Sequence, residues 1–183
     1  MIRYAPRRVT LPPNQPQAIR IGVRAPQDLA DGEYRVHMLF RAIPKAKAVT
    51  EQNNPEGGFS IALTPIYGVT IPVIVRQGNL TATAGIANGR IEEDNEGKSF
   101  AFDLSRTGDR STYGEIRITK PGLDEPLLVA RGIAVYPEVS SRKVALPIPN
   151  EIAEQLRGPV SVEYYEPRNA GGGLIAKTQM VLR

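Results

Sequence analysis

The sequence contains no cysteine and no tryptophan, and it has a single histidine in 183 residues. The absence of cysteine excludes disulfides and thiolate metal sites. The one histidine, His37, alternates with Arg35 and Arg41 in a strand-like segment. This setting favours a structural or surface role over that of a triad base or a zinc ligand. Because no constellation of nucleophile, base or metal ligands is present, we expect no enzymatic activity, no metal and no cofactor.

Long hydrophobic runs are also missing from the sequence. No stretch of 18 apolar residues exists, so no membrane-spanning helix is expected. The first residues, MIRYAPRRVTLPP, are basic but lack the apolar segment and the cleavage site of a signal peptide. The printed chain therefore predicts neither a membrane span nor a signal peptide.

Positive charge is distributed unevenly along the chain, whose net charge is +4. Residues 1–78 carry ten Lys or Arg against five Asp or Glu, whereas residues 79–183 carry thirteen against fourteen. A basic surface can meet nucleic acid, anionic lipid or an acidic protein. Because the arginines of the first part are spread singly through strand-like segments, we do not expect nucleic acid as a partner.

Short alternating segments separated by turn residues dominate the sequence, in which Gly and Pro occur 17 and 16 times. Residues 99–105 are typical, with Phe100, Phe102 and Leu104 predicted to point inward. Only residues 150–156 are helix-like. The pattern predicts an all-β protein of antiparallel sheets. The expected strands cover residues 2–11, 17–24, 33–43, 59–76, 80–87, 99–105, 113–119, 127–136, 142–148, 160–165 and 174–182.

We expect two immunoglobulin-like β-sandwich domains with a boundary near Gly78. Residues 79–183 supply about seven strands, the number in a complete immunoglobulin-like domain. Residues 1–78 supply only four expected strands, so this first domain lacks its initial strands. Half a sandwich leaves one apolar face uncovered.

The strand expected at residues 59–76 is about three times as long as a typical strand of five or six residues. Its alternate positions are all apolar: Phe59, Ile61, Leu63, Pro65, Tyr67, Val69, Ile71, Val73 and Val75. An exposed apolar edge strand promotes aggregation unless something covers it. The length therefore indicates either a strand shared with a second protein or a bent strand that crosses both sheets of one sandwich, with its corner near Gly68.

The order of motifs in residues 2–78 resembles the N-terminal domain of PapD-like periplasmic pilus chaperones. The likeness is carried by YAPRRVTLPPNQPQAIRI, then DLADGEYRVHMLFRAIP, then a long strand that ends PVIVRQG. Residues 79–183 match the second domain of that family in position and class more than in motif. The matching residues are Pro6, Leu11, Pro13, Gln17, Arg20, Ile21, Leu29, Ile43, Pro44 and Arg76.

The resemblance implies a periplasmic chaperone that stabilises pilus or fimbrial subunits by donor-strand complementation. Half of the long strand would complete the chaperone's own sandwich, and the other half would fill the groove of a subunit that lacks a strand. An outer-membrane usher is a further partner in this family. The alternative is a two-domain immunoglobulin-like surface or adhesion protein without chaperone activity. By position the donated side chains are Phe59, Ile61, Leu63 and Tyr67, and Val69, Ile71, Val73 and Val75 belong to the local core.

The sequence departs from the family at the expected carboxylate anchor. The family holds the subunit's C-terminal carboxylate with an Arg on the first strand and a Lys on the long strand. Here the first strand is absent and Pro72 occupies the Lys position, which leaves Arg76 as the candidate contact. Pro65 also lacks an N–H group for a strand ladder.

The family begins with a signal peptide and about three more strands, so we expect the beginning of the protein to be missing here. We also expect the incomplete first domain to be unstable or to exchange strands with a second copy.

Overall fold

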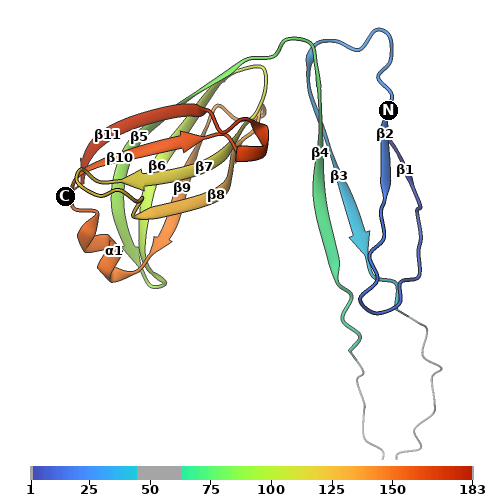
Figure 1. Cartoon of the computed structure of the whole chain (residues 1–183), viewed down its shortest axis with the longest axis horizontal. Helices are drawn as coiled ribbons and strands as arrows, with labels where there is room; N and C mark the ends of the chain where they lie inside the picture. The colour runs from blue at the N-terminus through green and yellow to red at the C-terminus, as the bar shows by residue number, and fades with distance from the viewer. Residues whose placement is uncertain (1, 45–62, 183) are drawn as a thin grey trace, which may run out of the picture. The chain divides into compact units, whose positions relative to one another are not determined.

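The computed structural model describes residues 2–44 and 63–182 and is an all-β protein of several antiparallel sheets, with 58% strand and 6% helix (Figure 1). This confirms the all-β part of the predicted fold class. The helix-like segment is α1 (Asn150–Gln155), and a 3-10 turn, η1 (Arg168–Ala170), also occurs. The strands are β1 (Ile2–Ala5), β2 (Arg20–Val23), β3 (Gly32–Arg41), β4 (Gly68–Gln77), β5 (Ala82–Asp94), β6 (Gly97–Gly108), β7 (Thr112–Thr119), β8 (Leu128–Val135), β9 (Ser141–Ile148), β10 (Gly158–Tyr165) and β11 (Leu174–Leu182).

The chain forms two compact units. The larger unit combines Met1–Glu33 with Arg76–Arg183, and the smaller unit is Tyr34–Val75. The single boundary expected near Gly78 lies two residues after Arg76, where the larger unit resumes. The larger unit therefore takes up residues on both sides of the smaller one in the sequence.

The core of the larger unit lies between two antiparallel sheets, an arrangement consistent with a β-sandwich. One sheet has the order β11-β10-β7-β8 and the other has the order β5-β6-β9, and Figure 1 shows them as the two layers of this unit. Phe100, Phe102 and Leu104 of β6 are completely buried, as their alternation predicts. They face Ile116 and Ile118 of β7, which belong to the same core cluster.

The first two strands form a small hairpin with one apolar face. In its antiparallel register Ile2 pairs with Val23 and Tyr4 pairs with Ile21. Residues directly opposite each other in such a pair lie on the same face of the sheet. Tyr4, Ile21 and Val23 are nevertheless exposed, so the described residues contain no second sheet that covers this face.

The strand expected at residues 59–76 begins, in the described part of the chain, only at Gly68. Its partner β3 ends at Arg41, and just beyond these bounds the Ala42 N–H donates to the Tyr67 carbonyl at 2.9 Å. Pro65 has no N–H with which to extend the ladder. The predicted strand is therefore too long over residues 63–67, whereas residues 45–62 lie outside the described part.

The prediction that β4 contributes four side chains to a local core is wrong for two of them. Val69 and Ile71 are exposed, and Val73 and Val75 are only half buried. The physical reason is that β4 pairs only with β3 in a two-stranded sheet. Within the described residues of the smaller unit, no second sheet packs against this one.

We expect Leu104→Ala in β6 to lower the free energy of unfolding of the larger unit by about 2–5 kcal/mol, because it leaves a cavity in the closed core. The matched control is Leu174→Ala in β11, where an exposed leucine is truncated and a change within about 0.5 kcal/mol is expected. Urea unfolding followed by circular dichroism measures both values. Equal losses for the two variants would contradict the position of the core.

Candidate functional site

Two of the four predicted donor side chains fall in the described residues, and both are strongly exposed. Leu63 is 90% exposed and Tyr67 is 76% exposed. Both lie on the segment that leads into β4. Phe59 and Ile61 lie outside the described residues, so the structure does not test their placement.

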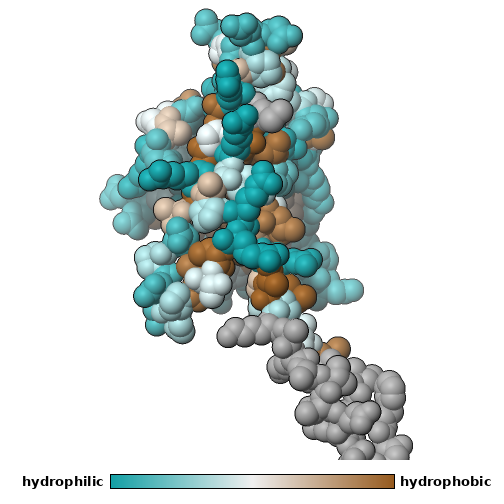
Figure 2. All heavy atoms as spheres, turned by 90° about the vertical axis from the view of Figure 1, so that its right-hand side faces the viewer, coloured by the Kyte–Doolittle hydropathy of each residue, from teal (hydrophilic) through white to brown (hydrophobic). Residues whose placement is uncertain are grey.

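The exposed apolar stretch continues from this segment into the first half of β4. Every residue from Leu63 to Pro72 is exposed. Figure 2 shows one face of the molecule, on which hydrophobic side chains, in brown, lie between hydrophilic ones. An extended segment with apolar side chains can add as a strand to an open sheet edge of another protein. The large apolar residues of the stretch are Leu63, Ile66, Tyr67, Val69 and Ile71.

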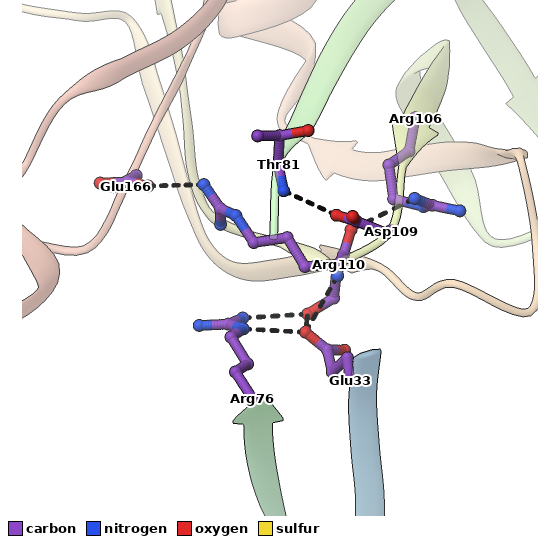
Figure 3. A network of polar contacts seen from close by, with 8 residues as sticks. Glu33, Arg76, Thr81, Arg106, Asp109, Arg110 and Glu166 are labelled. Carbon is purple, nitrogen blue, oxygen red and sulfur yellow. Dashed lines mark hydrogen bonds and ion pairs between the residues drawn. The ribbon is translucent and has the colours of Figure 1, made fainter. Parts of the chain in front are cut away.

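Arg76, the candidate contact for a carboxylate, binds a carboxylate of its own chain. Its Nε donates to Oε2 of Glu33 at 2.9 Å, and its Nη2 donates to Oγ of Ser111 at 3.2 Å (Figure 3). The Glu33 side chain is only 1% exposed, whereas that of Arg76 is 43% exposed. A buried carboxylate therefore holds the guanidinium in place, and one edge of the guanidinium faces solvent.

Glu33 is also bound to the loop that precedes β7. The same Oε2 accepts the backbone N–H of Ser111 at 3.0 Å and its hydroxyl at 2.8 Å. Oε1 of Glu33 is buried without a hydrogen-bond partner among the described residues. A single oxygen of Glu33, at the start of β3, therefore binds both Arg76 at the end of β4 and Ser111 in the loop before β7.

The loop before β7 is itself rigidly held. The Thr81 N–H donates to Oδ1 of Asp109 at 2.6 Å, and the Asp109 N–H donates back to the Thr81 carbonyl at 3.0 Å. The buried Arg106 donates to the carbonyls of Gly108 and Arg110 at 2.7 and 3.2 Å. Ser111 is therefore presented to Glu33 from a fixed support.

The environment of Glu33 keeps its carboxylate ionised. Burial alone would raise the pKa of Glu33, but the hydrogen bonds from Ser111 and then those from Arg76 outweigh it, so that the pKa lies below its ordinary value of 4.5. The ion pair with Arg76 is therefore intact at neutral pH.

Glu33 and Ser111 were not among the residues predicted from the sequence to form a site. A signal was present for Glu33, because it is the only acidic residue in β3 and Arg76 is the only charged residue in β4. Two single opposite charges near the ends of neighbouring strands favour a pairing. No comparable signal exists for Ser111, which lies 78 positions from Glu33 in the sequence.

A metal site and a membrane-spanning helix are two further features to consider in residues 2–44 and 63–182. These residues contain no group of three or more side chains suited to hold a metal ion. They also contain no helix with the length and apolar character needed to cross a membrane.

Comparison with known proteins gives no match. No protein-family model, no curated protein and no solved structure is significantly similar to this chain.

Glu33→Gln is expected to lower the free energy of unfolding of the larger unit by about 1–3 kcal/mol at pH 7, because it weakens charge-assisted hydrogen bonds to a buried group. Since the folded pKa is lowered, the contribution is complete above about pH 4.5 and is lost as the pH falls through the folded value. The difference between the wild type and the variant should therefore shrink at pH 3.

Urea unfolding at pH 7 and pH 3 measures this difference. The control is Glu93→Gln, which changes an exposed glutamate of β5. A deficit for Glu33→Gln that is the same at both pH values would show that the ionised carboxylate is not what stabilises the site.

Proposed function

We propose that the chain is a PapD-like assembly chaperone that binds pilus or fimbrial subunits by donating its apolar segment as a strand. The observation that carries the proposal is the exposure of Leu63 and Tyr67 at the head of β4. A subunit with an incomplete sandwich offers an apolar groove of the required shape. In this proposal, which follows the resemblance of residues 2–78 to the chaperone family, the protein acts in the periplasm with an outer-membrane usher as a second partner.

Burial of the donated side chains supplies the binding energy in this proposal. Each large apolar side chain contributes about 1.5–3 kcal/mol when it is removed from water. The four proposed donors, Phe59, Ile61, Leu63 and Tyr67, then give roughly 6–12 kcal/mol before the costs of association. Backbone hydrogen bonds to the subunit add to this, except at Pro65, which has no N–H to donate.

The anchor for the subunit's C-terminal carboxylate differs here from that of the family. In the proposal Arg76 first holds the end of β4 through Glu33. Its guanidinium is bound through Nε and Nη2, and the side chain is 43% exposed. That group is the one we assign to a subunit carboxylate. Because Glu33 already compensates the charge of Arg76, this contact contributes less than a free arginine would.

The larger unit supports the two-domain part of the proposal. Strands β5 to β11 form a four-stranded and a three-stranded sheet around one core. This strand count is that of an immunoglobulin-like domain. In the chaperone family a second domain of this class follows the strand-donating one.

The closed core of the larger unit also favours one alternative, a two-domain immunoglobulin-like surface or adhesion protein without chaperone activity. The core of the larger unit is closed, with completely buried side chains from both sheets. Such a domain needs no subunit for its own stability. The two functions differ in whether the segment before β4 is required for binding.

The test is Leu63→Lys, which places a charge on the donated segment without touching the larger unit. We expect it to abolish co-purification with a pilus subunit that lacks one strand of its sandwich, because an unpaired charge is not tolerated in an apolar groove. The matched control is Leu123→Lys, at an exposed leucine of the larger unit, which should bind as the wild type does. If Leu63→Lys retains binding, the donor assignment is wrong.

A further inference from the structure

We propose that a pocket on the larger unit binds a carboxylate joined to a flat apolar group. The pocket has a volume of about 430 Å³ and lies where the start of β7, a bulge in β8 and the β10–β11 connection meet. This site is separate from the segment before β4, and the inference does not depend on the proposed chaperone function. The residues that matter for the argument are Tyr113, Glu115, Arg131, Gly132, Pro167 and Arg168.

Two glycines keep the pocket open. A Cβ at Gly114 would overlap the carbonyl oxygen of Tyr165, so only glycine fits between β7 and β10 at this point. The pairing of β7 with β8 then shifts register, because Glu115 pairs with Arg131 and leaves Gly132 as the extra residue, with φ of 76°. A bulge of this kind redirects the neighbouring side chains. Here it sets Arg131 on the rim of the pocket.

The β10–β11 connection forms the other wall and is held by several backbone hydrogen bonds. The Glu166 N–H donates to the Gly173 carbonyl at 2.8 Å, which closes the connection. The N–H groups of Ala170 and Gly172 both donate to the Pro167 carbonyl. Pro167 and Arg168 are therefore held at the pocket by backbone bonds and are available to a ligand without rearrangement.

The charge balance of the pocket is positive. Oε2 of Glu115 accepts Nε of Arg131 at 3.2 Å, and Oε1 accepts the guanidinium of Arg117. These contacts lower the pKa of Glu115, with the hydrogen bond from Arg117 as the largest cause. The carboxylate is thus ionised and fully engaged. Arg168 forms no ion pair with any described residue, so its charge remains uncompensated.

The remaining surface of the pocket suits a flat apolar body. Tyr113 is 48% exposed, and Pro167 and the two glycines add apolar or backbone surface without long side chains. Tyrosine and arginine are enriched among the residues that carry binding energy. Arginine binds a carboxylate through two parallel hydrogen bonds, and Arg131, at 79% exposed, uses only its Nε within the protein.

The excess of arginine over glutamate in the pocket indicates an anionic ligand. Both Arg131 and Arg168 have N–H groups that make no contact within the described residues, and the planar fork of a guanidinium matches the two oxygens of a carboxylate. The volume is within the range of small-molecule sites. A carboxylate of this kind comes from a free aromatic acid or from an acidic side chain next to an aromatic residue in a peptide.

The experiment uses the full chain and observes the ligand, so that self-association of the protein does not prevent the measurement. Saturation-transfer NMR is recorded with phenylacetate, with the neutral phenylacetamide and with the blocked dipeptide N-acetyl-Glu-Phe-amide. We expect saturable binding of at least one carboxylate and at least tenfold weaker binding of the amide, because a charge-assisted pair is lost. The stronger of the two carboxylates identifies the source.

Arg168→Ala should weaken carboxylate binding about tenfold, since it removes the free guanidinium. The matched control is Arg157→Ala, which changes an exposed arginine that pairs with Glu154 outside the pocket, and it should bind as the wild type does. Arg168→Gln removes the charge but keeps a polar side chain, and it replaces the alanine variant if that variant unfolds. Equal binding of the amide, unchanged binding by the Arg168 variants or an equal loss in Arg157→Ala would each overturn the proposal.

Discussion

An apolar face of a β-sheet has to be covered, and this constraint distinguishes the closed β5–β11 sandwich from the strands β1 to β4. In the larger unit the inner faces of two sheets cover each other, so Phe102 and Ile116 are lost from solvent altogether. The hairpins β1–β2 and β3–β4 have the same alternation but no opposing sheet among the described residues. Most of the exposed large apolar side chains accordingly lie before residue 76. A surface of this kind is typical of a protein that is completed by a partner.

The Glu33–Arg76 pair lies within the larger unit, at the two positions where residues 34–75 leave and rejoin it in the sequence. Its carboxylate is buried and receives three hydrogen bonds on one oxygen. Removal of a buried carboxylate from water is costly, and only these donors make the ionised form stable there. The loop that supplies Ser111 depends in turn on Arg106 and Asp109. The arrangement therefore fixes, within the larger unit, the residues at which β3 begins and β4 ends.

The sequence predicted what depends on local alternation and missed what depends on distant partners. The inward positions of Phe100, Phe102 and Leu104 follow from the period of a strand, and the structure confirms them. The same alternation predicted that Val69 and Ile71 lie in a core. Alternation shows only which side of a strand is apolar, however, and not whether another sheet packs against that side. The exposure of Leu63 and Tyr67 fits the predicted donor segment, whose function remains a proposal. The bond between Glu33 and Ser111 could not be found, because nothing in either local sequence specifies the other.

Because Glu33 and Arg76 touch each other, residues 34–75 leave the larger unit and return to it at nearly the same place. Asp31 and Gly78 lie close together as well, since a Cβ at Gly78 would overlap the Asp31 carboxyl group. A few residues of extended chain, at about 3.3 Å each, span such a gap. The smaller unit is thus an insertion in the sequence of the larger unit. A short turn that joined residues 33 and 76 in its place would leave the β5–β11 core intact.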